Sequence, residues 1–283
     1  MFKIAINGFG RIGKLVTRRL FDLGLGENLV LINEQTGSIE NLATLLEFDS
    51  IHGHWTNNIE PGENFIKIDH HEIKVSNSSS ITALKRAISN VDLLIDCTGS
   101  NKNFNALQQY LDFGVKSVLV SSPIKDDRIL NIVYGVNHDR YDPTQNYLVT
   151  AASCTTNCLA PIVKVLNERV GIRHGTITTI HNVTNSQTII DKPAGNIRRG
   201  RSALNSLFPS TTGSATAISL IFPELKGKLN GHAVRVPVLN ASLTDCVFEI
   251  KRKITANEIN ALFEHASKHE LTGILGYEKR ELV

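Results

Sequence analysis

The sequence predicts a two-domain α/β protein, with a doubly wound parallel sheet in the N-terminal domain and a mainly antiparallel sheet in an α+β second domain. Length is the first observation, because 283 residues exceed the usual size of one domain. The second is the alternation of short β-branched runs with helical patterns over the first 150 residues, which is typical of βαβ units. The third is the change to longer β-type runs afterwards. We therefore expect one domain over residues 1–150 and another over 151–283.

The N-terminal domain is expected to alternate strands with helices. Strands are predicted at residues 3–7, 29–33, 91–99 and 116–122, and helices at 11–24, 38–48 and 102–113. Ser38 is the expected N-cap of the second helix. Residues 53–80 are mixed and polar, which favours a hairpin insertion. The last two strands run into small hydroxyl or glycine residues, as expected at the carboxyl edge of a doubly wound sheet, where ligands bind.

The second domain is expected to start where a strand over residues 147–153 meets a helix. That helix begins at Cys154 and extends to the region of Asn167. Longer β-type runs follow at 175–183 and 233–252, and a further helix at 256–268. This order predicts an α+β domain with an antiparallel sheet.

Composition excludes several classes of protein. No apolar run approaches the roughly 18 residues that span a bilayer, so no membrane partner is expected. A net charge of +3 permits anionic ligands but is too weak to indicate nucleic acid, and the only local basic run is IRRGR at 197–201. The start MFKIAINGFG leads directly into a strand without a secretory pattern, so we expect a cytoplasmic protein. Four scattered cysteines do not make a disulfide scaffold.

A glycine-rich turn lies between the first predicted strand and helix. Gly8, Gly10 and Gly13 form a GxGxxG pattern, in which glycines permit a tight turn and close approach of a pyrophosphate to the helix N-terminus. Glu34 follows the second strand, where a carboxylate can bind both ribose hydroxyls and repel a 2′-phosphate. The pattern therefore favours NAD over NADP as cofactor. The alternative is a plain turn with Glu34 as a solvated loop residue.

Cys154 is the candidate nucleophile. A thiol at a helix N-terminus ionises more readily, because unpaired N–H groups and the helix dipole favour the thiolate. His181 ends the run TITTI and could be directed back at the helix start, where it would serve as the base. A simply packed cysteine is the main alternative. A zinc site with Cys158 ranks lower because it lacks two further ligands, so no metal is expected and Cys158 is taken as a packed or hydrogen-bonding thiol.

Hydroxyl and backbone donors indicate anion binding in the second domain. One candidate group comprises Ser153, Thr155, Thr212 and Gly213. Thr184 and Arg235 form a second, in which the guanidinium can bind two phosphate oxygens. Each residue alone could instead be a cap, a turn or a surface charge. Together they indicate a phosphorylated substrate.

Several motifs, in this order, resemble the phosphorylating glyceraldehyde-3-phosphate dehydrogenase family: INGFGRIG, ASCTTNCLAP, TTIH, the RR-R run followed by a TTG turn, and RVP. The resemblance extends from residue 2 to residue 283. It implies an NAD-binding Rossmann domain and a catalytic domain, usually in a homotetramer, that act on glyceraldehyde 3-phosphate and inorganic phosphate through a cysteine thioester.

The resemblance also implies a role for each matching residue. Cys154 would be the nucleophile and His181 the base. Thr184 and Arg235 would hold the sugar phosphate, and the attacking phosphate would be held by Ser153, Thr155, Thr212 and Gly213. The cofactor positions would be Gly8, Phe9, Gly10, Arg11, Ile12, Gly13, Glu34, Thr98, Gly99 and Ser121.

A finer resemblance is to the branch of this family that is associated with arsenate resistance. It is carried by TLLEFDSIHGHW (44–55), IRHGTITTIHNVTNSQT, TTGSATAI and VLNASLTDCVFE. It implies that arsenate can replace phosphate as the attacking anion and form 1-arseno-3-phosphoglycerate, which a partner permease exports. An alternative activity is that of erythrose-4-phosphate dehydrogenase, a sibling that shares the Asn-Glu ending of the second strand but usually lacks the TTG turn kept here.

The end of the sequence motivates a second hypothesis. The family continues beyond the GYEKRELV stretch with an asparagine that orients the nicotinamide and a final helix, whereas this sequence ends at Val283. The resemblance thus implies a catalytic domain that is C-terminally incomplete, with exposed apolar surface and one cofactor contact fewer. The alternative function is a truncated relative that binds NAD or RNA without catalysis.

Overall fold

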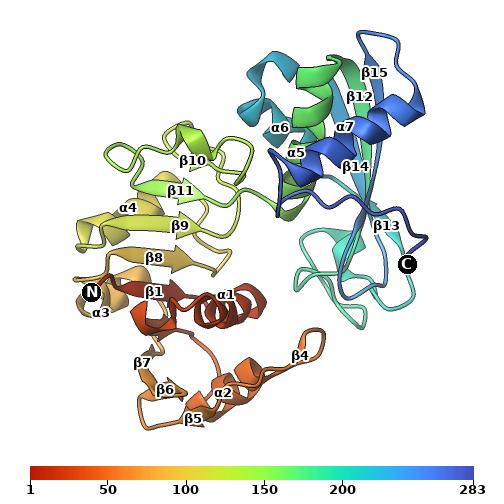
Figure 1. Cartoon of the computed structure of the whole chain (residues 1–283). Helices are drawn as coiled ribbons and strands as arrows, with labels where there is room; N and C mark the ends of the chain where they lie inside the picture. Colours follow the sequence, from red (N-terminus) through yellow and green to blue (C-terminus); the bar gives the residue numbers. More distant parts are fainter. The chain divides into compact units, whose positions relative to one another are not determined.

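The computed structural model describes residues 1–283, apart from the side chain of Ser214. The chain divides into two compact units (Figure 1). Unit 1 comprises Met1–Ile132 and Tyr141–Ala152, and unit 2 comprises Val133–Arg140 and Ser153–Val283. None of the helices in the described part of the chain is long and apolar enough to cross a membrane.

Unit 1 is built on one large sheet, in the order β10-β11-β9-β8-β1-β2-β7-β6-β5. Its strands are β1 (Ile4–Asn7), β2 (Leu29–Asn33), β5 (Ile59–Pro61), β6 (Phe65–Ile68), β7 (His71–Ser76), β8 (Leu93–Asp96), β9 (Ser117–Val120), β10 (Leu130–Asn131) and β11 (Leu148–Thr150). From β10 to β7 every neighbouring pair is parallel, and only the β7-β6-β5 edge is antiparallel. Because β2 and β8 flank β1, the chain winds away from β1 in both directions, as the doubly wound prediction requires.

Two hydrophobic cores cover the two faces of this sheet. The helices are α1 (Arg11–Asp22), α2 (Ile39–Glu47), α3 (Ile81–Ile88) and α4 (Phe104–Asp112). Side chains alternate across a strand, so Ile4 and Ile6 of β1 enter the core that also holds α2, while Ala5 enters the core that holds α3 and α4. All three β1 residues are almost fully buried. A parallel sheet buried on both faces explains why its central strands are continuous apolar runs.

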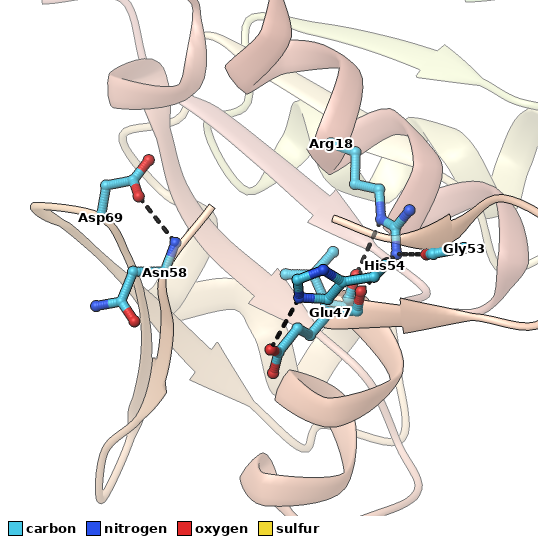
Figure 2. A network of polar contacts seen from close by, with 7 residues as sticks. Arg18, Glu47, Gly53, His54, Asn58 and Asp69 are labelled. Atoms are coloured by element: carbon cyan, nitrogen blue, oxygen red, sulfur yellow. Dashed lines mark hydrogen bonds and ion pairs between the residues drawn. The ribbon is translucent and has the colours of Figure 1, made fainter. Parts of the chain in front are cut away.

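Arg18 of α1 forms hydrogen bonds both with the C-terminal end of α2 and with a small hairpin. The hairpin consists of β3 (Phe48–Asp49) and β4 (Gly53–His54). The Arg18 guanidinium donates to the Leu46 carbonyl at 2.9 and 2.7 Å, and to the Glu47 and Gly53 carbonyls at 3.1 Å each (Figure 2). The last carbonyls of a helix have no partner within the helix. The buried arginine therefore satisfies the Leu46 carbonyl, which would otherwise lose its hydrogen bonds to water, and adds to the Glu47 carbonyl, which also accepts the Trp55 N–H at 2.8 Å.

Unit 2 contains a four-stranded sheet in the order β13-β14-β12-β15. The strands are β12 (Ile172–His181), β13 (Phe208–Ser210), β14 (Leu229–Arg235) and β15 (Leu243–Ile250), and the helices are α5 (Cys154–Arg169), α6 (Ser214–Ile221) and α7 (Ala256–Lys268). Two of the three strand pairs are antiparallel, and β12 pairs with β14 in parallel. α5 packs against α6, α7 and the sheet (Figure 1). The α+β character predicted for the second half is confirmed.

Several predicted elements need correction. Residues 53–80 do form hairpins, but they are not an insertion, because β7 pairs in parallel with β2 and so extends the main sheet. The run at 233–252 is two strands rather than one, with residues 236–242 between them. The helices α3 and α6 were not predicted. By contrast, Ser38 is confirmed as an N-cap: its hydroxyl accepts the Asn41 N–H at 3.3 Å.

Candidate functional site

The glycine-rich turn after β1 is so tightly packed that two of its glycines have no room for a side chain. Gly8 has a positive φ of 93°, and a Cβ on it would lie 2.7 Å from the backbone of Cys97 and Thr98. A Cβ on Gly13 would lie 2.1 Å from the Gly8 carbonyl oxygen. Both positions therefore exclude any side chain, and the turn brings the start of α1 against the end of β1.

Glu34 points back at this turn from the residue after β2. Its Oε2 accepts the Phe9 N–H at 2.8 Å, and its Oε1 accepts the N–H and the hydroxyl of Thr36 at 3.3 and 3.2 Å. The carboxylate is thereby held beside the glycine-rich turn. A single carboxylate in that position suits two ribose hydroxyls and disfavours a phosphate.

Buried polar side chains link the carboxyl ends of β1, β2 and β8. Asn33 donates to Asn7 at 2.8 Å, Asn7 to the Tyr110 hydroxyl at 2.6 Å, and Tyr110 to Asp96 at 2.9 Å. Asp96 also accepts the N–H and the hydroxyl of Thr98 at 2.9 and 2.7 Å. This network fixes the turn that carries Thr98 and Gly99. Sequence reasoning missed it, since the partners come from separate strands and from α4.

The same edge of the sheet fits a dinucleotide. Gly10 is the N-cap of α1 and makes no side-chain cap, the first turn carries no acidic residue, and a Cβ on Gly10 would meet nothing within 4 Å. A helix start of this kind, with neither a capping side chain nor an acidic residue, suits an anion such as a pyrophosphate. Phe9, Arg11 and Ile12 complete the turn, and Ser121 follows β9, its N–H bonded to the Asp96 carbonyl at 2.9 Å. All the predicted cofactor positions therefore lie at the carboxyl ends of β1, β2, β8 and β9.

Cys154 is the first residue of α5, behind a sharp turn. Ala152 has a φ of 55°, a left-handed conformation that costs a non-glycine residue about 1–2 kcal/mol. Ser153 is the N-cap of α5, since its hydroxyl accepts the Thr156 N–H at 3.1 Å. The thiol therefore lies where the first N–H groups of α5 favour a negative charge.

His181 ends β12 and faces the thiol. Its Nε2 lies 3.6 Å from Cys154 Sγ, and the side chain is 8% exposed. The hydrogen bond from His181 lowers the pKa of Cys154 to about 7, with smaller help from Thr155, whose hydroxyl is 4.0 Å away. Cys97 and Cys246 differ, because burial raises their thiol pKa values to about 12 and about 11. The geometry thus brings together the predicted thiol and the predicted imidazole.

Arg235 ends β14 beside His181. The two residues are register partners on parallel strands, and Arg235 Nη1 lies 2.7 Å from His181 Nδ1 and donates to the Asn182 carbonyl at 2.9 Å. Burial, followed by the nearby Arg199, lowers the pKa of the Arg235 guanidinium. Its Nε is buried without a hydrogen-bond partner among the described residues. This guanidinium retains an unused donor.

The loop after β12 adds hydroxyls and a second guanidinium. Thr184 Oγ1 lies 2.9 Å from Ser186 Oγ, which accepts from Arg199 Nη1 at 2.5 Å. Arg199 was not singled out as a site residue, although it lies in the IRRGR run that was noted for its charge. Thr212 and Gly213 lie at the start of α6, on a separate element, where Gly213 is the N-cap.

Cys158 lies one turn beyond Cys154 on α5, and its Sγ donates to Thr244 Oγ1 at 3.9 Å. All four cysteines are free thiols. No group of three or more histidine, cysteine, aspartate or glutamate residues able to hold a metal occurs among the described residues.

Comparison with known proteins matches both halves of the chain. The glyceraldehyde 3-phosphate dehydrogenase NAD-binding domain matches residues 2–104, and the C-terminal domain of the same enzyme matches residues 153–283. The chain belongs to the glyceraldehyde-3-phosphate dehydrogenase family. It is 51% identical over 282 residues to glyceraldehyde-3-phosphate dehydrogenase 3 of Nostoc sp., covering 99% of this chain and 83% of that protein. Glyceraldehyde-3-phosphate dehydrogenase 1 of Bacillus cereus is 44% identical over 283 residues, with 100% and 84% covered.

Membership of this family identifies the chain as an NAD-dependent oxidoreductase. The glycine-rich turn, Glu34 and the start of α1, which has neither a capping side chain nor an acidic residue, agree with that cofactor. The Rossmann-type sheet carries the cofactor positions, and the second unit carries the thiol, the imidazole and the guanidinia.

Proposed function

We propose that this protein oxidises glyceraldehyde 3-phosphate with NAD and inorganic phosphate to 1,3-bisphosphoglycerate. The observation that carries the proposal is the 3.6 Å approach of Cys154 Sγ to His181 Nε2, with a thiol pKa of about 7, in a chain of this family. A thiolate at neutral pH is the nucleophile that an aldehyde oxidation through a covalent intermediate requires.

Each unit has its own task in this proposal. Residues 1–150 are the NAD-binding domain, in which the glycine-rich turn receives the pyrophosphate, Glu34 receives the ribose hydroxyls, and Thr98, Gly99 and Ser121 line the same edge. Residues 151–283 are the catalytic domain. Bound NAD supplies the acceptor for the hydride that leaves the substrate carbon.

The residues of the second unit perform the remaining chemistry. The Cys154 thiolate attacks the aldehyde carbon, so that an S–C bond forms and the C=O π bond breaks, and the oxygen takes a proton from water to become the hydroxyl of a thiohemiacetal. His181 Nε2 takes the proton of that hydroxyl as the carbon is oxidised to a thioester. Phosphate then attacks the thioester carbon, the S–C bond breaks, and the Cys154 thiolate is regenerated.

Two anion sites in the second unit are assigned from the same family resemblance. Thr184 and Arg235 hold the phosphate of the sugar, and the unpaired Arg235 Nε supports this role because an anion would satisfy it. The attacking phosphate is assigned to Ser153, Thr155, Thr212 and Gly213. Arg199 joins the first group, since it lies close enough to Arg235 to lower the pKa of its guanidinium and reaches Thr184 through Ser186.

Formation of NADH from glyceraldehyde 3-phosphate tests the proposal. We expect steady turnover with phosphate present and a single turnover without it. Cys154→Ala should abolish NADH formation, whereas Cys158→Ala, one helical turn away, should retain it. If the Cys154→Ala variant still forms NADH, or if the unaltered chain forms none, the proposed reaction is excluded.

Arsenate is proposed as an alternative attacking anion, with a role in arsenate resistance. Its shape and charge resemble those of phosphate, and hydroxyl and backbone donors discriminate poorly between such similar anions. The resemblance of residues 44–55 and of the segments around Thr184 and Thr244 to the arsenate-resistance branch supports the role. Deletion of the gene should increase sensitivity to arsenate and leave growth on sugars unchanged, and an unchanged sensitivity would contradict it.

We also propose that the chain assembles into a homotetramer in the cytoplasm. Support comes from exposed apolar side chains in unit 2, where Leu243 and Val247 of β15 are 63% and 65% exposed. Exposed apolar surface of this kind marks protein contacts. Light scattering of the purified chain should give four times the mass of one chain, and a monomer at all concentrations would contradict the assignment.

A further inference from the structure

Two histidines lie one helical turn apart at the C-terminal end of α7. His265 belongs to the last turn of the helix, and His269 is its C-cap. Their imidazole rings are stacked, with 4.0 Å between the ring centroids and an angle of 15° between the ring planes. Both residues are exposed, so the pair is accessible from solvent. Neither ring has a part in the proposed reaction.

The Nδ1 atom of each ring faces an oxygen that can only accept a hydrogen bond. His269 Nδ1 lies 2.8 Å from the His265 carbonyl oxygen, and His265 Nδ1 lies 3.6 Å from Glu270 Oε2. The carbonyl places the proton of a neutral His269 on Nδ1, and the carboxylate favours the same tautomer for His265. The lone pair of each neutral ring is then on Nε2. Histidines that bind metals usually have this arrangement, with the other ring nitrogen donating to a carbonyl or a carboxylate.

The backbone that carries the second ring is held in place. The His269 N–H donates to the Ala266 carbonyl at 3.3 Å, and the His269 carbonyl accepts the N–H and the hydroxyl of Thr272 at 3.1 and 2.8 Å. Leu271, two residues further on, is fully buried in a cluster with Val165 of α5. A ligand that binds both rings therefore has little backbone to order, which lowers the entropic cost of binding.

The charges near the two rings favour a cation. The C-terminal end of a helix carries a partial negative charge, and Glu270 adds a carboxylate beside His265. Arg169 is bound to the other oxygen of that carboxylate, with 3.1 Å between its Nη2 and Glu270 Oε1. Glu264, on the same helix, is paired with two lysines at 2.9 and 3.0 Å. Two lone pairs at a negative helix end suit a positive ion.

We propose that His265 and His269 chelate one divalent transition-metal cation through their Nε2 atoms, with water completing its coordination. Imidazole is a good ligand for Zn²⁺, Ni²⁺ and Cu²⁺, and two histidines four positions apart on a helix can bind one ion together. Rings stacked at 4.0 Å need only side-chain rotations to bring both Nε2 atoms to about 2.0–2.1 Å from that ion. The inference does not depend on the proposed function.

The bound ion stabilises the end of α7. It links the last turn of the helix to the segment that carries Leu271, and Leu271 packs with Ala266 against Val165 of α5. An ion that binds the folded chain more tightly than the unfolded chain shifts the unfolding equilibrium towards the folded state. Ni²⁺ should therefore raise the unfolding temperature of unit 2, which contains all of these residues.

Calorimetric titration of the full chain with Ni²⁺ tests the proposal. The titrations use a Cys154→Ala chain, because the thiolate of Cys154 would compete as a metal ligand. We expect one ion per chain, and an affinity at least about tenfold lower when His265→Ala or His269→Ala is added, since the second imidazole binds intramolecularly. His174→Ala is the matched control, because His174 is an exposed single imidazole 3.1 Å from the carboxylate of Glu249. This control should bind Ni²⁺ like its parent.

An unchanged affinity after either His265→Ala or His269→Ala, or a loss as large after His174→Ala, would overturn the proposal. Thermal denaturation is the second measurement. Ni²⁺ should raise the unfolding temperature of the Cys154→Ala chain and leave that of the chain with His269→Ala added unchanged, and equal shifts in the two would contradict the proposal.

X-ray diffraction from a crystal soaked in Ni²⁺ locates the ion directly. We expect an anomalous difference peak between the rings of His265 and His269. A peak at other residues without one at this pair would overturn the proposal. Urea denaturation without Ni²⁺ confirms that each variant is folded, which is expected because both side chains are exposed.

Discussion

Cys154 Sγ and His181 Nε2 lie 3.6 Å apart, although 27 positions separate the two residues in the sequence. α5 begins at the thiol and β12 ends at the imidazole, so two regular elements hold the pair. A site carried by element ends is positioned more rigidly than one carried by a long loop. The chemical behaviour of Cys154 should therefore depend on His181 in a way that can be measured.

His181→Asn should raise the pKa of Cys154, because the hydrogen bond from His181 is the largest cause of its depression to about 7. The thiolate fraction rises with pH, so alkylation of the unaltered chain should be half-maximal near pH 7. In the variant the midpoint moves to higher pH, and the alkylation rate at neutral pH falls by about tenfold or more. Iodoacetamide kinetics across the pH range measure both. A midpoint that does not move would show that His181 does not control the thiol.

The glycine-rich turn permits a matched pair of substitutions. Gly13→Ala places a Cβ 2.1 Å from the Gly8 carbonyl oxygen, so we expect a loss of unfolding free energy of about 1–3 kcal/mol together with weaker NAD binding. Gly10→Ala meets nothing within 4 Å, so it should retain stability and lose only NAD affinity through its position at the anion-binding helix start.

Urea denaturation and fluorescence titration with NADH measure these two effects. Equal stability of the Gly13→Ala and Gly10→Ala variants would contradict the packing derived for this turn. An unchanged NADH affinity in both would contradict the placement of the cofactor.

Arg18→Leu should destabilise unit 1. The substitution leaves the Leu46, Glu47 and Gly53 carbonyls without their common donor, at a cost of about 2–4 kcal/mol in unfolding free energy. Arg19→Leu, an exposed neighbour on the same helix, is the control and should change stability by less than about 0.5 kcal/mol. Similar urea midpoints for the two variants would show that the network in Figure 2 contributes little.

Features that depend on local sequence were predictable. The spacing of Gly8, Gly10 and Gly13 and the position of Glu34 follow from one βαβ unit, and the structure places them side by side. Cys154 at a helix start follows from a strand pattern that meets a helical one. His181 could be named as a candidate from its place at a strand end, but only the fold shows which of the ten histidines faces the thiol.

Features that depend on distant partners were not predictable. β7 belongs to the main sheet through its pairing with β2, which no local pattern shows. α3 was also missed, although Ser80 is its N-cap, with the Ala83 N–H donating to the Ser80 hydroxyl at 3.2 Å. The Asn182 carbonyl, which accepts a hydrogen bond from Arg235, was not predicted because it is a backbone group. Side-chain chemistry alone does not show where a carbonyl points.

Trapping of the covalent intermediate shows whether Cys154 carries the substrate as a thioester. The full chain is mixed with NAD and glyceraldehyde 3-phosphate without phosphate, quenched in acid and analysed by mass spectrometry. We predict one phosphoglyceroyl group per chain, located on the peptide that contains Cys154 and removed on addition of phosphate before the quench. NADH formation without any adduct, or an adduct on Cys158 instead, would show that Cys154 does not carry the substrate.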